Sequence, residues 1–74
     1  DDQLVSRSQA KRLLTRFDRF KQVVLDFKDV KLIGQAFADE IFRVFKSAHP
    51  EVTISHINTE KPVEEMILHV LESK

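Results

Sequence analysis

The chain has 74 residues, of which 42% are hydrophobic, and this is enough for one small core. It contains no cysteine, which excludes disulfides and thiolate metal sites, and no apolar run approaches the roughly 20 residues that cross a membrane. Net charge is zero, but residues 1–37 carry eight basic side chains against five acidic ones, and residues 38–74 carry four against seven. Direct nucleic-acid binding needs a stronger basic excess interleaved with aromatic residues. We therefore interpret the basic half as a solvated helix face, with an acidic protein partner as the alternative.

A short strand and a helix are expected at the start of the chain. Residues 4–5 are an apolar pair, and Ser6 with Gln9 fits a capping box, in which two side chains satisfy free amides at a helix start. Phe20 is expected to close this helix against the core. Apolar residues at helical spacing predict an amphipathic helix over residues 7–18: Ala10, Leu13, Leu14 and Phe17.

Two later segments are predicted to form strands. "QVVLDF" (residues 22–27) is short and rich in β-branched and aromatic residues, and "EVTISHI" supplies a second strand over residues 52–57. In the first strand, Val24 and Asp26 lie on the face opposite the apolar one, so that face is expected to be only partly covered. The apolar face of the first strand comprises Val23, Leu25 and Phe27.

Two further helices are predicted, over residues 35–48 and 61–73. The first ends by His49, because the residue before a proline is pushed out of the helical region. The second has Pro62 in its first turn, where a missing amide is tolerated. The first carries three aromatic residues that we expect in the core: Phe37, Phe42 and Phe45. If one of them is exposed, it would be a good anchor for a protein partner.

Strands that alternate with helices indicate an α/β fold with parallel pairing and right-handed crossovers. Because the strands are short and two have a polar second face, we expect a two-layer sheet with the helices mainly on one face. An open face or edge then remains for something else to cover.

The only glycine, Gly34, stands in the loop between the first of these strands and the helix after it. Ligands and partners of parallel sheets usually meet such loops at the carboxyl ends of the strands. A glycine there allows either a positive φ angle or a close approach of two backbones. The amides of the next helix are able to bind an anion. No GxGxxG or P-loop pattern surrounds the residue, so a nucleotide cradle is not indicated.

The titratable residues form no catalytic constellation in the sequence. None of the three histidines pairs with another at helical spacing, which argues against a metal site. Asp39 and Glu40 are adjacent and so point to different sides of a helix. We expect one to face solvent and the other to bind Lys31 or Arg43, while Asp26 hydrogen-bonds the glycine loop. The chain is therefore expected to be no enzyme and to need no cofactor.

The segment "VVLDFKDVKLIGQAFADEIFRVF" resembles the central stretch of STAS domains, the anti-sigma-factor antagonist fold. "LVSRSQAKRLL" and "VTISHINTEKPVEEMILHV" lie where that family places its first helix and its next strand and helix. The chain is most similar to STAS-like bacterial domains of unknown function, which carry "S-R-S-x-A-x-R-L" and "G-x-x-F-A-D-E-[IL]-F-R-V-F". The second signature is read here from Gly34 to Phe45. We expect residues 1–74 to be a single such domain, cut from a longer, cytoplasmic bacterial protein, because the chain opens without methionine.

The loop departs from the STAS pattern "V-x-F-I-D-S-S-G", in which a kinase phosphorylates a serine. Gly34, Gln35 and Ala36 replace Asp-Ser-Ser, and Phe37 replaces the glycine. Without a hydroxyl, the loop cannot gain the roughly −1.5 to −2 charge of a phosphoryl group. Incubation with such a kinase and ATP is therefore expected to leave the domain's function unchanged, and functional labelling of any residue, Ser47 included, would contradict this.

The resemblance implies a regulatory protein-interaction module whose partner is a signalling ATPase or a DNA-binding regulator. Its docking surface would be centred on residues 34–37, with Asp39, Glu40 and Arg43 on the turns behind them. Two alternatives stay open: a sensor of a small ligand or anion at the Gly34 loop, and a structural module that completes a larger sheet or a homodimer.

Overall fold

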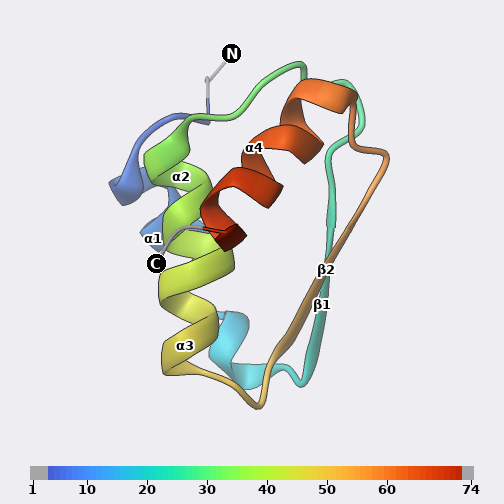
Figure 1. The fold of residues 1–74 in the computed structure, drawn as a ribbon. Coiled ribbons are helices and arrows are strands. Elements are labelled where there is room, and N and C mark those ends of the chain that lie inside the picture. Colours follow the sequence, from blue (N-terminus) through green and yellow to red (C-terminus); the bar gives the residue numbers. More distant parts are fainter. Residues whose placement is uncertain (1–3, 73–74) are drawn as a thin grey trace.

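The structure is a computed structural model that describes residues 4–72. Three consecutive elements, α2, η2 and α3, run on as one long helix (Figure 1). The last helix is predicted to reach residue 73, which lies outside the described residues. The elements are α1 (Arg7–Leu14), the 3-10 turn η1 (Phe17–Arg19), β1 (Gln22–Asp26), α2 (Gln35–Asp39), the π-helix η2 (Glu40–Phe45), α3 (Lys46–Ala48), β2 (Thr53–Ile57) and α4 (Lys61–Glu72).

The two strands β1 and β2 pair in parallel, with Gln22 opposite Thr53 and Asp26 opposite Ile57. All the helices lie on one side of this sheet (Figure 1), which confirms the predicted two-layer α/β architecture. The other side is open, and Val24 on it is 51% exposed. The expected first strand is reduced to a single parallel bridge between Leu4 and Ile33.

Helix α1 begins where the sequence predicts, at Arg7, but ends before the predicted residue 18. The Ser6 hydroxyl accepts a hydrogen bond from the Gln9 amide at 3.1 Å, and the Gln9 side chain accepts one from the Ser6 amide at 2.8 Å. This confirms the capping box. The helix stops at Leu14, and the chain is already extended at Phe20. Phe20 is 55% exposed, so the prediction that it closes the helix is wrong; Phe17 packs instead, edge-on against Phe45 at 6.3 Å between ring centroids.

The core lies between the helices and the inner face of the sheet. All three aromatic residues of the long helix belong to it, as predicted. Among residues 4–72, no helix is both long enough and apolar enough to cross a bilayer. The buried apolar residues are Ala10, Leu14, Phe27, Ile33, Phe37, Ala38, Ile41, Phe42, Phe45, Val52, Val63, Ile67 and Val70.

The carboxyl ends of the two strands are joined by Asp26. Its Oδ1 accepts hydrogen bonds from the Lys28 amide and from Asn58 Nδ2, each at 3.0 Å. Both bonds lower the pKa of Asp26, and the bond from Asn58 has the larger effect. Asp29 and Asn58 both adopt positive φ angles in the turns that follow the strands. Asp26 therefore fixes the strand ends, and the prediction that it hydrogen-bonds the glycine loop is wrong.

Candidate functional site

The Gly34 loop owes its glycine to a close approach of two backbone segments. Gly34 has φ −79°, which any residue adopts, so the positive-φ option is excluded. Its amide donates to the Leu4 carbonyl at 2.8 Å, and its carbonyl accepts from the Ala38 amide at 3.0 Å. A Cβ at this position would lie 2.7 Å from both Cα and O of Val5. The glycine thus lets the N-terminal segment pack directly against the start of the long helix.

An arginine from the first helix joins the two carboxylates of the long helix. Arg7 Nη1 lies 3.1 Å from Asp39 Oδ2 and 3.0 Å from Glu40 Oε1. Arg43 binds both oxygens of Asp39, with Nη2 donating to Oδ2 at 2.8 Å. We call these four residues the arginine–carboxylate cluster. The cluster ties α1 to the long helix at the point where α2 passes into the π-helix η2. Such π-helical turns inside α-helices are frequent at functional sites.

The arginine–carboxylate cluster favours the ionised form of Asp39. Both carboxylates are nearly buried, Asp39 at 9% and Glu40 at 7% exposure. Hydrogen bonds from Arg43 and then Arg7 lower the pKa of Asp39, against burial, which raises it. The bonds from Glu40 and Asp39 raise the pKa of Arg7. The prediction that one carboxylate faces solvent is therefore wrong, whereas the predicted pairing of a carboxylate with Arg43 is confirmed. Lys31 lies near Glu60, at 3.9 Å.

The predicted docking residues occupy three different environments. Gln35 is exposed, and Gly34 and Ala36 are half-buried. Phe37 is 1% exposed and packs in the core. Residues 39 and 40 lie beneath the arginines, and the side chain of Arg43 remains 46% exposed. Of the predicted docking residues, Gln35 and Arg43 are therefore the two with exposed side chains.

Sequence patterns missed two contributors to this surface. Leu32, just before the glycine, is 63% exposed, and Arg7 is 44% exposed although it binds both carboxylates. The apolar type of Leu32 predicts burial, so only the structure shows it on the surface. Beside Leu32 lies a groove of about 390 Å³ between the loop and α4, lined by Leu32, Gln35, Pro62, Glu65, Met66 and His69.

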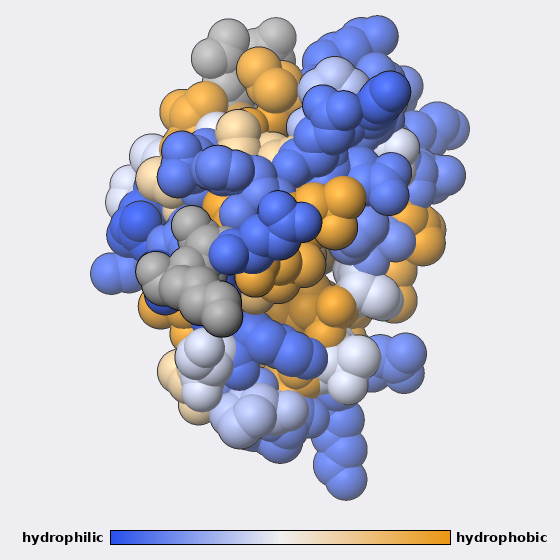
Figure 2. All heavy atoms as spheres, in the orientation of Figure 1, coloured by the Kyte–Doolittle hydropathy of each residue, from blue (hydrophilic) through white to orange (hydrophobic). Residues whose placement is uncertain are grey.

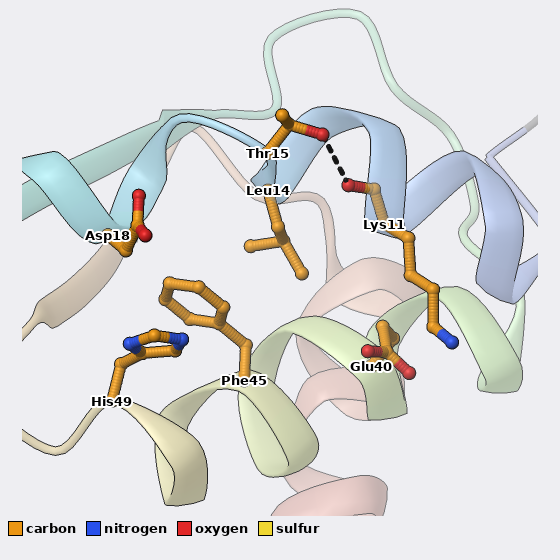
Figure 3. Close-up of a pocket in the computed structure, with 7 residues that line it drawn as sticks. All are labelled: Lys11, Leu14, Thr15, Asp18, Glu40, Phe45 and His49. Carbon is orange, nitrogen blue, oxygen red and sulfur yellow. Dashed lines mark hydrogen bonds between the residues drawn. The ribbon is translucent and has the colours of Figure 1, made fainter.

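A second hollow, of about 310 Å³, lies between α1 and the long helix (Figure 3). Leu14 and Phe45 point toward its centre, and His49 stacks on Phe45 at 4.5 Å between ring centroids. The Thr15 hydroxyl donates to the Lys11 carbonyl at 3.0 Å. The remaining lining residues are one basic and two acidic side chains: Lys11, Asp18 and Glu40.

These side chains do not form a catalytic arrangement in the part of the chain that the structure describes. Nucleophilic or acid–base catalysis needs a reactive group hydrogen-bonded to a base that a third group orients. The ring of His49 approaches Glu51, at 3.5 Å from Nδ1, and not Asp18 or Glu40. Within residues 4–72, no three His, Asp or Glu side chains are grouped so that they could hold a metal ion.

Comparison with known proteins places the chain in a family. The family model of the STAS-like domain of unknown function (DUF4325) matches residues 9–64, which include α1 from Gln9 onward, the sheet and the arginine–carboxylate residues Asp39, Glu40 and Arg43. No curated protein and no solved structure matches the chain. Since the model covers more than half of the sequence, the chain belongs to the STAS-like domains of unknown function.

Proposed function

We propose that this chain is a non-enzymatic protein-interaction module that regulates signalling or transcription in the cytoplasm of a bacterium. Its partner would be a signalling ATPase or a DNA-binding regulator, in the same chain or a separate one. The observation that carries the proposal is the surface around Gly34. Leu32 and Gln35 are exposed there, next to an apolar groove against α4. Apolar patches rimmed by polar residues mark interaction sites, and here Leu32, Pro62 and Met66 line the groove beside polar side chains.

The residues in and beneath this surface favour docking of a partner over regulation by phosphorylation. Residues 34–36 contain no hydroxyl group that a kinase could modify. The close approach of Gly34 to the Val5 backbone fixes the loop. The salt bridges of Arg7 to Asp39 and Glu40 fix the helix that follows it. A surface that is already ordered loses less conformational entropy when a partner binds. The arrangement therefore suits a constitutive docking site.

The substitution Gln35→Glu tests this proposal with little change in shape. A negative charge in the first turn of a helix is tolerated or slightly favourable, so the unfolding temperature should stay the same or rise. Binding to the ATPase or regulator encoded beside the gene should weaken by about tenfold, because a desolvated carboxylate replaces a neutral amide. Titration calorimetry of the two proteins measures the change.

The matched control for that substitution is Gln22→Glu. Gln22 is exposed at the start of β1 and is not part of the Gly34 surface. The control should bind the partner as the parent chain does. Equal binding by Gln35→Glu and the parent chain would show that the Gly34 segment is a turn and no docking site.

A further inference from the structure

One edge of β2 has backbone groups that no strand within residues 4–72 pairs with. The Thr53 amide donates to the Lys21 carbonyl at 2.8 Å, and the Ile57 carbonyl accepts from the Phe27 amide at 3.0 Å. Because backbone groups alternate along a strand, those of Ile54 and His56 point to the opposite edge. Neither residue has a backbone hydrogen bond to any other part of residues 4–72. Such an edge is a template for another strand.

A hollow of about 250 Å³ lies directly beside this edge, beneath α4. Figure 2 shows hydrophobic atoms exposed between the end of α4 and the strands. Leu71, at its rim, is 54% exposed. A third strand paired with β2 would cover the hollow, because the side chains on its inner face would enter the space between the sheet and α4. The hollow is lined by Phe42, Lys46, Ile54, His56, Ile67 and Leu71.

The polar groups of the hollow are basic or neutral. Lys46 Nζ donates to the Val52 carbonyl at 3.2 Å, which leaves it further protons to donate. His56 packs edge-on against Phe42, at 6.0 Å between ring centroids, and its Nδ1 is buried without a hydrogen-bond partner in residues 4–72. None of the lining residues that the structure describes is acidic. Apolar walls with an ammonium group match an apolar side chain next to a carboxylate.

We propose that the edge of β2 is a docking site for an extended segment of another protein, which adds as a third strand. Its main chain would pair with Ile54 and His56, an apolar side chain would fill the hollow, and an acidic side chain would bind Lys46. This mode of recognition combines main-chain hydrogen bonds with a side-chain pocket. The surface is distinct from the one around Gly34, so this site goes beyond the proposed function and stands or falls separately.

A second copy of the chain matches the same edge less well. Two β2 strands paired with each other would lie about 4.8 Å apart. A second β2, Thr53–Ile57, would bring no acidic side chain to Lys46. A small molecule would fill the hollow but leave the strand edge unpaired. The free backbone groups therefore favour a peptide segment.

The test uses capped peptides of about nine residues, long enough to span β2, with hydrophobic residues at alternate positions. One set has a central glutamate, and the matched set has a central lysine. In a titration followed by NMR, the glutamate set should shift the amide signals of Ile54 and His56 and the methyl signals of Leu71. It should also slow hydrogen exchange of the two amides. The lysine set should bind at least about tenfold more weakly.

Two leucines on the same helix supply matched variants. Leu71→Glu places a carboxylate at the rim of the hollow and should weaken binding of the glutamate set by at least about tenfold. Leu68→Glu, at a position that is 49% exposed and does not line the hollow, should leave binding within about twofold. Both changes are at exposed sites, so folding should survive.

Several results of this experiment would contradict the proposed docking site. Absence of binding by the glutamate set, equal binding by Leu71→Glu, or signal changes confined to other surfaces would each overturn the proposal. A dimer formed by the chain through β2 would overturn it too. Gln35→Glu should bind the peptides as the parent chain does, which separates this site from the Gly34 surface.

Discussion

Gly34→Ala is expected to destabilise the fold although the φ angle suits alanine. The added Cβ would stand 2.7 Å from Cα and O of Val5, and these backbone atoms have no rotamer through which to move away. Overpacking of this kind costs about 1–3 kcal/mol. For a domain of this size each kcal/mol lowers the unfolding temperature by roughly 4–8 °C. Thermal unfolding followed by circular dichroism measures the loss.

The control is Gln35→Ala, one residue further along the chain. Gln35 is exposed, so its truncation should change the free energy of unfolding by less than about 0.5 kcal/mol. The bridge between Leu4 and Ile33 should weaken only in Gly34→Ala, with faster exchange of the residue-34 amide. If Gly34→Ala were as stable as the parent chain, the N-terminal segment would not pack against the glycine.

Asp39→Asn is expected to cost about 1–3 kcal/mol at neutral pH, because charged hydrogen bonds to a poorly solvated group are lost. The Asp39 side chain is 13% exposed and receives hydrogen bonds from Arg7 and Arg43. The asparagine keeps the shape but presents an amide group to one of the arginines. Urea unfolding at neutral pH measures the difference in the free energy of unfolding.

The pH dependence of this effect has a definite sign. The arginines lower the pKa of Asp39 below its usual value of 3.8 in the folded state only. The stabilisation is therefore complete above that usual value and is lost as the pH falls through the lower, folded-state pKa. Parent and Asp39→Asn should differ most at neutral pH and converge as the pH falls through the lowered, folded-state pKa of Asp39.

The control for the acid limb is Asp18→Asn, at an exposed position of η1. It should change the free energy of unfolding by less than about 0.5 kcal/mol at either pH. A constant difference between Asp39→Asn and the parent chain across the pH range would contradict the account. The effect of residue 39 would then reside in packing rather than in charge.

The architecture could be predicted because local patterns and global fold agree. Alternation over residues 22–27 and apolar spacing over residues 35–48 both reflect burial on one face, and burial on one face is what the two-layer arrangement requires. Phe20 shows the limit of this reasoning. Its spacing fits the first helix, but that helix ends at Leu14, and the 3-10 turn that follows rotates Phe20 to the surface.

The site could be predicted only in part, because tertiary contacts determine it. Arg7 meets Asp39 and Glu40 across 32 and 33 residues, and adjacent positions on a helix give no sign that one arginine will reach both. The glycine was recognisable as a constrained position, but its reason lies in the distant Val5 backbone. The resemblance to STAS-like domains supplied the docking hypothesis, and the structure refines it to the exposed residues Leu32, Gln35 and Arg43.

The most direct test of the docking surface is NMR mapping of the chain with the ATPase or regulator encoded beside its gene. The account predicts loss or shift of the Gln35 amide signal, the Leu32 methyl signals and the Arg43 side-chain signal on addition of the partner. Signals of Val24, on the open face of the sheet, should stay unchanged. Binding that shifts Val24 and spares Leu32 and Gln35 would contradict a docking surface at the Gly34 loop.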